Sequence, residues 1–430
     1  MRLLISLLLL VSQTVFAIPQ IQHWQTSNGA NVYFVAAPDL PMLDVEVVFD
    51  AGSARDGNKS GLSMMTNGLL KEGAANLSAD QLAEKLDDVG AKISASVGND
   101  MASVKLRSLT QPSLLEPALD LFELVLTEPS FDANSFERLR QQSIISLKYQ
   151  QQSPSSIVKR AFYGAVFDNH PYAQLSNGTI KTINALKLSD LKQFYKRYYL
   201  ANNATISIVG ALNRKAAENL ANQIVNKLPN GNLPAPLPEV AALTKGKTIE
   251  INHPSTQTKI LIGQPGVARG VHDYFALYVG NYILGGSGLV SHLAEEVREK
   301  RGLAYSAYSY FIPLKVAGPF IAGVGTSNTT VDQALSVMKN TIRKFRKTGP
   351  TKKELKVAKQ GITGGFPLKI KSNSDIIGYL SVIGFYKLPL DYLHKFNQNV
   401  DSVTVEMIKT AFQQRLDLDK MVTVMVGKRS

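Results

Sequence analysis

The feature that most constrains this chain is an internal repeat. Ser130-Phe131-Asp132 precedes a predicted helix late in the first half of the chain, and Gly349-Pro350-Thr351 precedes one late in the second half. The two segments are 350 − 131 = 219 residues apart. Both patterns then open with a charged stretch that contains a glutamate, Phe136-Glu137-Arg138 and Lys353-Glu354-Leu355. A repeat of this length indicates an ancient duplication, so we expect the chain to fold as two similar units.

One stretch between the two copies lacks any regular pattern. The segment LPNGNLPAPLPEVAALTKGK, Leu228–Lys247, is rich in Pro, Gly and Ala. It has neither the alternation of a strand nor the period of an amphipathic helix. It predicts a linker at residues 229–247, between an N-terminal domain at residues 18–228 and a C-terminal domain at residues 248–430.

Each half begins with strands and continues with helices. In the first half, LDVEVVFD at Leu43–Asp50 alternates like a half-buried strand. In the second half, a strand at Thr258–Ile262 is followed by a predicted helix at Asp273–Leu284 and by strands near Ala304–Phe311 and Pro319–Thr326. This order is typical of α+β domains with a largely antiparallel sheet and helices on one face. The sequence therefore predicts two homologous α+β domains that form half of a clamshell.

The N-terminus has the pattern of an export signal. Residues 1–17, MRLLISLLLLVSQTVFA, place Arg2 before an apolar stretch and predict a signal peptide that is cleaved after Ala17. The alternative is an uncleaved membrane anchor, but the apolar stretch Leu3–Val11 is shorter than the ~20 residues that span a bilayer. The chain has no cysteine, which excludes disulfides and lipid attachment through an N-terminal cysteine. We expect a periplasmic or secreted protein without a stable membrane anchor.

The chain is basic, with a formal net charge of +13. Such a charge could favour anionic membranes, nucleic acid or acidic peptides. The lysines and arginines are spread over both halves without a run of five, however, which is typical of an ordinary solvated surface. We therefore expect no nucleic-acid partner.

The segment Ala51–Leu77, AGSARDGNKSGLSMMTNGLLKEGAANL, is the most informative part of the first half. A strand ends, a Gly-rich turn follows, and an amphipathic helix begins at Gly61-Leu62. This segment resembles the active-site segment of the insulinase/pitrilysin metallopeptidases, and in particular of their bacterial processing-peptidase-like members. In that family a strand ending in G-S-R is followed by G-L-A-H-x-x-E-H on a helix. The two His bind zinc, and the Glu between them polarises the attacking water.

The residues that stand at those positions here are unsuited to zinc chemistry. Met64 and Gly68 replace the two His, and Asn67 replaces the Glu. A thioether is a soft ligand, glycine has no side chain, and a neutral amide cannot accept a proton from water. The family's third ligand is a Glu that the resemblance places within Arg138–Gln152, RLRQQSIISLKYQQQ, which contains no acid. The resemblance implies a member that binds no metal or other cofactor itself. The alternative is that Met64 and Asn67 belong to a different active centre.

The second half keeps another segment of the family. Gly285-Gly286-Ser287-Gly288 leads into LVSHLAEEVREKRGLAYSAYSYF, Leu289–Phe311, which resembles the family's G-x-x-S-x-L-F-x-x-L-R-E-x-x-G-L-A-Y. The resemblance implies that the glycine-rich stretch contacts substrate. It also implies that Arg298 and Tyr305 hold the scissile peptide and its oxyanion, where a guanidinium and a phenol are effective donors. The alternative is that Arg298 forms a surface ion pair with Glu295 and that Tyr305 packs within a strand.

Bacterial members of the family often consist of two chains, one with the zinc motif and one with the Arg/Tyr segment. The resemblance, which covers essentially residues 25–425, therefore implies the non-zinc subunit of a heteromeric periplasmic metallopeptidase. Zinc would belong to a homologous partner, and the two subunits would enclose an extended peptide that adds a strand to a sheet edge. The alternatives are a non-catalytic peptide-binding or structural clamshell and, last, a self-sufficient metalloprotease. As an isolated chain it is not expected to be a peptidase.

Overall fold

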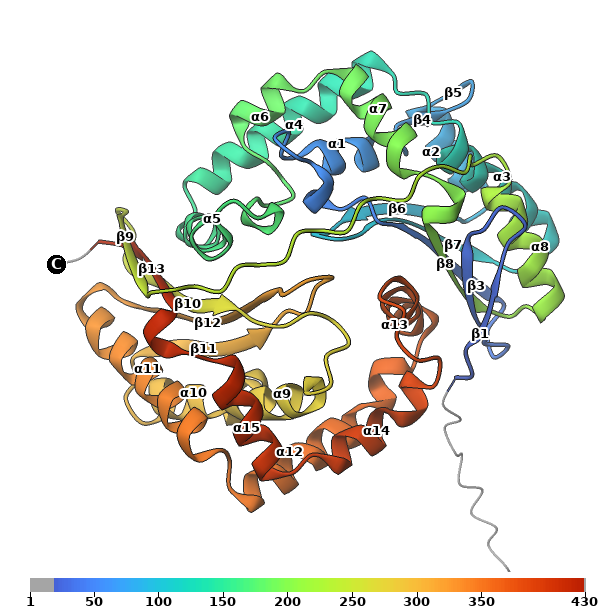
Figure 1. Cartoon of the computed structure of the whole chain (residues 1–430). Helices are drawn as coiled ribbons and strands as arrows, with labels where there is room; N and C mark the ends of the chain where they lie inside the picture. The colour runs from blue at the N-terminus through green and yellow to red at the C-terminus, as the bar shows by residue number, and fades with distance from the viewer. Residues whose placement is uncertain (1–18, 429–430) are drawn as a thin grey trace, which may run out of the picture.

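The computed structural model describes residues 19–428, which form two sheet-and-helix units (Figure 1). The predicted signal peptide, residues 1–17, lies outside the described residues. Within residues 19–428 no helix combines the length and the apolar character that crossing a bilayer requires.

The first unit is built on a six-stranded sheet. Its strands are β1 (Gln22–Gln25), β2 (Asn31–Ala36), β3 (Met42–Phe49), β6 (Lys92–Val97), β7 (Ala102–Leu109) and β8 (Ala204–Gly210), with a separate small pair, β4 (Gly73–Ala74) and β5 (Leu77–Ser78). The strand order is β1-β2-β8-β3-β7-β6, and only β2 and β8 pair in parallel. Its helices are α1 (Leu62–Leu69), α2 (Ala79–Asp88), α3 (Pro112–Thr127), α4 (Ala133–Gln151), α5 (Pro154–Phe167), α6 (Ile180–Ala185), α7 (Leu188–Tyr198) and α8 (Arg214–Val225).

The second unit repeats this plan on a five-stranded sheet. Its strands are β9 (Lys247–Asn252), β10 (Gln257–Pro265), β11 (Ala304–Phe311), β12 (Pro319–Ser327) and β13 (Val422–Gly427). Their order is β11-β12-β10-β13-β9, and only β13 and β9 pair in parallel. Its helices are α9 (Tyr274–Asn281), α10 (His292–Ala294), α11 (Val331–Thr348), α12 (Lys352–Gly365), α13 (Asn373–Phe385), α14 (Tyr392–Ser402) and α15 (Val405–Arg415). The predicted α+β class with largely antiparallel sheets is confirmed.

Three helices of the first unit recur in the second at the spacing that the sequence predicts. Helices α3 and α11 begin at Pro112 and Val331, which are 331 − 112 = 219 residues apart. The same offset relates the first residues of α4 and α12, since 352 − 133 = 219, and of α5 and α13, since 373 − 154 = 219. Two homologous domains are therefore present in one chain.

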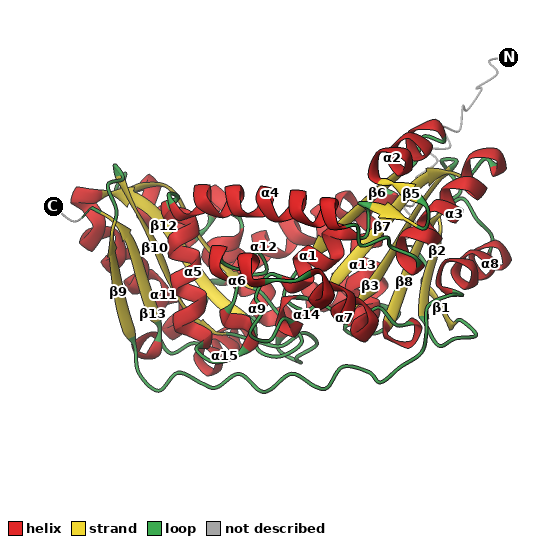
Figure 2. Cartoon of the chain, turned by 90° about the horizontal axis from the view of Figure 1, so that it is seen from above, coloured by secondary structure: helices red, strands yellow, loops and turns green. Residues whose placement is uncertain are grey.

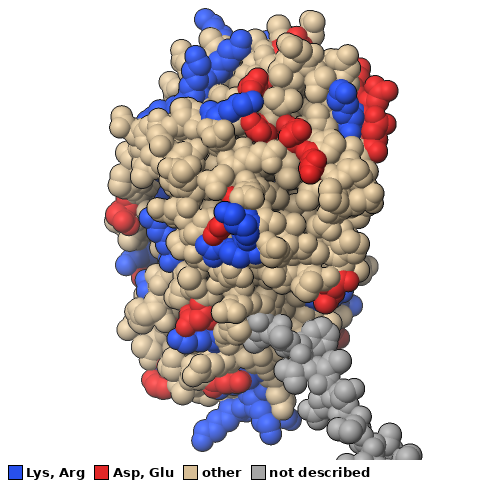
Figure 3. All heavy atoms as spheres, turned by 90° about the vertical axis from the view of Figure 1, so that its right-hand side faces the viewer, with Lys and Arg blue, Asp and Glu red and all other residues tan. Residues whose placement is uncertain are grey.

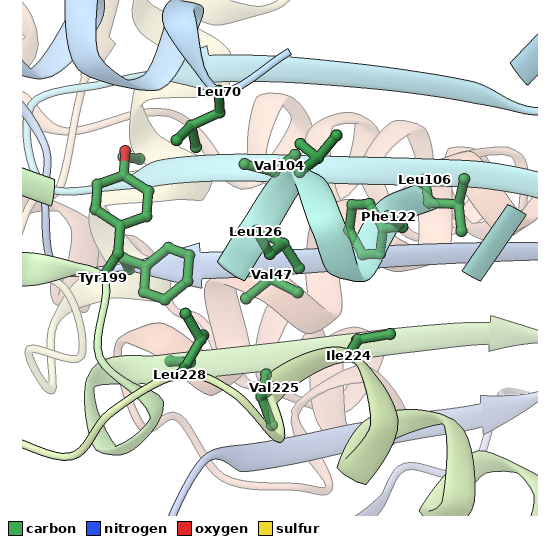
Figure 4. Packing of buried hydrophobic residues seen from close by; sticks show 14 of the residues in the cluster. Val47, Leu70, Val104, Leu106, Phe122, Leu126, Tyr199, Ile224, Val225 and Leu228 are labelled. Carbon is green, nitrogen blue, oxygen red and sulfur yellow. The ribbon is translucent and has the colours of Figure 1, made fainter. Parts of the chain in front are cut away.

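The core of the first unit lies between its sheet and its own helices. Alternate residues of the sheet, such as Val47 of β3 and Val104 of β7, are completely buried and point toward Phe122 of α3 (Figure 4). Burial of each such side chain contributes roughly 1.5–3 kcal/mol, so this face holds the helices firmly on the sheet.

The opposite face of each sheet is covered by a helix from the other unit, which the sequence did not predict. Helix α5 packs on β10 and β13, and α13 packs on β3 and β8. The contacts are close: a Cβ at Gly263 of β10 would lie 2.8 Å from Cζ of Phe162, and one at Gly384 of α13 would lie 2.6 Å from Cγ2 of Thr205. This reciprocal exchange of helices joins the two units into one body.

The chain between α8 and β9 contains neither helix nor strand and runs along one side of the molecule (Figure 2). Several of its carbonyl oxygens nevertheless accept hydrogen bonds from side chains of the first unit. Arg197 donates to Asn232 O at 2.8 Å, and Arg55 donates to Ala235 O at 2.7 Å. This connection is thus fixed against the first unit.

Charged side chains of both signs lie among each other on the face seen in Figure 3. That face has no continuous basic patch of the kind that binds nucleic acid. The distribution is in keeping with the ordinary solvated surface that the sequence predicts.

Candidate functional site

Helix α1 is held by a buried amide at the position of the family's catalytic glutamate. Asn67 is 1% exposed. Its Nδ2 donates to Ser96 O at 2.9 Å and to Ser103 O at 3.0 Å, and its Oδ1 accepts from Tyr199 Oη at 2.9 Å. These bonds tie α1 to strands β6 and β7. Asn67 therefore has a structural role, and its amide has no free group for proton transfer.

The residues at the positions of the family's two histidines make packing contacts. Met64 is half-buried against the core of the first unit. Gly68 faces α4, where a Cβ would lie 3.2 Å from Cδ2 of Leu139. Ser143 of α4 donates to Sδ of Met65 at 3.5 Å.

These contacts leave no ligand set for zinc at the family's metal site. Helix α4 carries the segment in which the third ligand would lie, and it packs directly on α1. Within residues 19–428, no group of three His, Cys, Asp or Glu side chains is placed to hold a metal ion. The residues of this site do not fit zinc, which agrees with a chain that does not bind the metal itself.

The turn that leads into α1 keeps a buried carboxyl group. Asp56 is 5% exposed and accepts from the backbone amides of Gly61 at 2.7 Å and Ser63 at 2.8 Å. Burial raises the pKa of Asp56 to about 7, although the amide hydrogen bonds act in the opposite direction. Asp56 therefore fixes the turn that precedes α1 through the first backbone amides of the helix.

The segment that carries Arg298 and Tyr305 runs from a helical turn into strand β11. A single π-helical turn at Glu295–Glu299 holds Arg298, whose carbonyl accepts from Gly302 N at 2.8 Å. Gly302 has a φ of 61°, which ends the helix and turns the chain into β11. A one-residue irregularity in the pairing of β11 with β12 lies between Ala304 and Ala307, and Tyr305 stands within it.

Tyr305 is exposed and Arg298 is half-buried, and both have few polar contacts. Tyr305 is 84% exposed, so it does not pack within the strand. Arg298 approaches Glu299 at 3.4 Å, whereas Glu295 pairs with Lys300 at 2.9 Å. The alternative arrangement, an Arg298–Glu295 pair and a packed tyrosine, is not the one observed. β-Bulges commonly redirect a side chain, and here the bulge presents a phenol to solvent.

The glycine-rich stretch divides into a buried and an exposed part. Gly285 belongs to a π-helical turn at Tyr282–Gly286, and a Cβ there would meet Ser309 of β11, coming within 2.5 Å of its backbone nitrogen. Gly286 and Gly288 are exposed, and Ser287 is half-buried. They are followed by Leu289 and Val290, which are 59% and 78% exposed. These two apolar residues are not among those predicted from the sequence, although their place after the glycine-rich segment was a signal.

The structure does not bring the two predicted sets together. Helix α1 packs on the six-stranded sheet, while Arg298 and Tyr305 belong to the five-stranded sheet. Among the described residues, no hydrogen bond or ion pair joins Met64, Asn67 or Gly68 to either of them. A single copy of this chain therefore does not assemble both halves of the family's site.

Comparison with known proteins assigns the family. Residues 33–180 match the model of insulinase, peptidase family M16, and residues 185–362 match the model of the peptidase M16 inactive domain. The chain belongs to the M16 family. The resemblance drawn from its motifs is thus confirmed.

Relatives of this M16 chain include enzymes and non-peptidases. It is 38% identical to a peptidase M16 inactive domain from Pseudomonas fluorescens, with a TM-score of 0.92 over 95% of this chain and 98% of that one. The non-peptidase homolog YmxG of Helicobacter pylori is 24% identical over 393 residues, 91% of this chain and 90% of its own. The periplasmic protease PqqL of Escherichia coli shares the fold, with a TM-score of 0.80 at 17% identity over 95% of this chain and 45% of PqqL.

A second polar centre of this M16 chain lies between its two units, and the sequence analysis missed it. Asp100 is 2% exposed and accepts from Tyr172 Oη at 2.6 Å, Tyr386 Oη at 2.9 Å and Lys315 N at 2.8 Å. Burial, together with the nearby Asp100, raises the pKa of both tyrosines, which stay neutral donors. This centre fixes the loop between β11 and β12, and the end of α13, against the first unit.

Proposed function

We propose that this chain is the non-zinc subunit of a heteromeric periplasmic metallopeptidase. In this proposal Arg298 and Tyr305 enter the active site of a zinc-bearing homologous partner. One observation carries it: Tyr305 stands 84% exposed on a bulge, while α1 of the same chain offers no ligand for a metal. Bulges are common next to active sites, where they redirect a side chain, so a role of Tyr305 toward another molecule is favoured.

Each side chain has a defined task in this proposal. The guanidinium of Arg298 offers fixed donors to a substrate carbonyl, and the phenol of Tyr305 donates to the oxyanion that develops during attack. The exposed Gly286 and Gly288 let a peptide backbone approach closely, because they carry no side chain. The partner's zinc supplies the activated water.

The substrate in this proposal is an extended peptide. The two sheets end in the edge strands β6 and β11, each of which pairs on one side only. Such edges accept an additional strand through main-chain hydrogen bonds, which gives broad sequence preference.

Reconstitution tests the proposal. The partner is first identified by co-purification from the native envelope, and peptide cleavage is then measured for each subunit and for the mixture. We expect the mixture to exceed the zinc subunit alone by about 10²-fold, and Tyr305→Phe or Arg298→Ala to remove most of that increase. Arg301→Ala is the matched control, because Arg301 lies three residues from Arg298 and is paired with Glu296. A mixture that is no faster than the zinc subunit would refute the proposal.

The second candidate is a non-catalytic peptide-binding or structural clamshell. It is favoured by the similarity to a relative that is named a non-peptidase homolog. Under this function Arg298→Ala and Tyr305→Phe leave the turnover of any partner unchanged, so the same assay separates the two. Zinc retained by the isolated chain after dialysis against a chelator would instead favour a self-sufficient metalloprotease.

A further inference from the structure

A hollow of about 410 Å³ lies between α5 and the outer part of the five-stranded sheet. Its size is within the range of pockets that bind small ligands or single side chains. The side chains that define its chemistry are Lys159 and Tyr163 of α5, Lys259 and Leu261 of β10, and Tyr308 and Tyr310 of β11.

Two glycines of β12 make room for two of the side chains that line this hollow. A Cβ at Gly323 would lie 2.5 Å from Oη of Tyr308, and one at Gly325 would lie 2.5 Å from Nζ of Lys259. The ring of Tyr308 and the stem of Lys259 therefore lie flat over the glycine backbone. Glycine weakens a strand interior and is typical of places where another group approaches the sheet closely.

The charge of the hollow is positive and uncompensated. None of the residues that line it is acidic. Lys259 is half-buried, and its Nζ donates to the neutral Gln257 Oε1 at 3.2 Å. Lys159 lies with its Nζ 6.0 Å from the centre of the Tyr163 ring, and in the described part of the chain neither lysine has an ion pair. Two ammonium groups at one pocket favour an anionic ligand.

The remainder of the lining is aromatic and apolar. The rings of Tyr308 and Tyr310 lie 5.2 Å apart, and Leu261 with Ile321 forms the apolar floor. Burial raises the pKa of Tyr163 and Tyr308, so these phenols are neutral donors at physiological pH. The chemistry therefore suits a ligand that has an apolar or aromatic body and a carboxylate.

The edge strand indicates that this ligand is a peptide. β11 pairs with β12 on one side only, and Ser306, Tyr308 and Tyr310 line the hollow from alternate positions of that strand. An extended chain beside β11 would lie along the rim of the hollow.

We propose that this hollow binds the C-terminal carboxylate and the last apolar or aromatic side chain of an extended peptide. The site is formed by this chain alone and needs neither Arg298 nor the zinc of a partner. It uses the edge strand β11, to which the proposed function also assigns peptide binding, so the inference rests on that part of the proposed function and adds which end of the peptide is recognised.

Calorimetric titration of the mature chain tests this proposal. The probe is an unstructured eight-residue peptide ending in phenylalanine, with either a free carboxylate or an amide at its C-terminus. We expect the amidated peptide to bind at least tenfold more weakly, because a charge-assisted hydrogen bond is lost. The measurement uses this chain alone, so its outcome is independent of whether a zinc-bearing partner is activated.

Variants locate the site. We expect Lys259→Met to weaken the free-carboxylate peptide about tenfold and the amidated peptide by less than twofold. Gly325→Ala should weaken binding while circular dichroism stays unchanged, because the new Cβ displaces the flexible end of Lys259. Lys85→Met is the control, since Lys85 is an exposed residue of α2 in the other unit and should leave affinity unchanged.

Four outcomes would overturn the proposal. The first is equal binding of the free and amidated peptides, and the second is undiminished affinity of folded Lys259→Met. The third is tighter binding of decanoate than of the peptide, which would assign the hollow to a fatty carboxylate. Failure of the folded chain to bind the free-carboxylate peptide at millimolar concentration has the same consequence.

Discussion

The faces of the two sheets that the exchanged helices cover carry opposite chemistry. On the six-stranded sheet, Asp44 of β3 is completely buried beneath α13 and pairs with Arg107 at 2.9 Å and Lys105 at 3.1 Å. On the five-stranded sheet, Lys259 of β10 lines the hollow beneath α5 and has no ion pair among the described residues. The strand next to Asp44 places Arg107 opposite it, whereas the strand next to Lys259 places Gly325 opposite it.

This difference shows that the side chains beneath the exchanged helix could change after the duplication. The strands and the crossing helix are kept, whereas one copy has an ion-paired cluster beneath that helix and the other has a hollow lined by lysines and tyrosines. A filled position contributes to the stability of the fold, and an open one is available to a ligand. The shared strands and helix determine where a site can lie, and the side chains beneath the helix determine whether a site is present.

The sharpest test of this comparison is Asp44→Asn. It replaces the buried carboxylate that binds Lys105 and Arg107, and because Arg107 is 41% exposed and can be solvated, we expect a loss of about 3 kcal/mol in the free energy of unfolding. The change Lys259→Met in the second unit should cost less than about 1 kcal/mol, because no acid is left unpaired. Urea unfolding of both variants measures the difference, and equal losses would show that the two sheets do not differ in this way.

A second contrast lies at the first helix of each unit. Asp273 before α9 is bound by Arg415 at 2.7 and 3.0 Å, whereas Asp56 before α1 accepts from backbone amides and has no ion pair among residues 19–428. Burial raises the pKa of Asp56 from 3.8 to about 7. The folded state therefore binds the proton more tightly, and the stability due to this group is complete below pH ~4 and lost as the pH rises through about 7.

The raised pKa of Asp56 predicts how the stability of the protein depends on pH. Relative to Asp56→Asn, the wild-type chain should lose about 3 kcal/mol in the free energy of unfolding between pH 5 and pH 8. Denaturant unfolding at three pH values in that range provides the measurement, and the subtraction removes the groups that both proteins share. A difference that stays constant or grows with pH would mean that Asp56 remains ionised in the folded protein.

The smallest expected effect concerns the exchanged helices. Tyr386, just after α13, donates to Asp100, while its counterpart after the repeat offset is the apolar Phe167 at the end of α5, since 386 − 167 = 219. Tyr386→Phe makes the two units alike at this position and should cost about 1 kcal/mol for the lost hydrogen bond. Tyr149→Phe on the exposed side of α4 should cost nothing by the same urea assay. If the two substitutions have equal effects, the hydrogen bond to Asp100 does not hold the units together.

Several parts of this protein follow from short stretches of sequence. Alternation in β3 and β10 predicted the central strands, and the repeat at 219 residues predicted two homologous domains. The loss of zinc ligands at Met64, Asn67 and Gly68 was equally readable, because a metal site needs particular functional groups at particular positions.

Other parts were decided only by tertiary structure. The exchange of α5 and α13, the buried Asp100 and the hollow over Gly323 and Gly325 depend on residues that are far apart in the chain. The phenol of Tyr386, for example, meets Asp100 across 286 residues.

The physical reason is the distance along the chain between the residues that interact. Periodicity and the chemistry of a motif are properties of a few neighbouring residues, so the sequence by itself determined the class of fold, the family and the missing metal ligands of this chain. Which face a helix covers, and whether a glycine leaves a space or a neighbour fills it, depend on packing between distant segments. Those choices placed the phenol of Tyr305 in solvent and left a cationic hollow beneath α5.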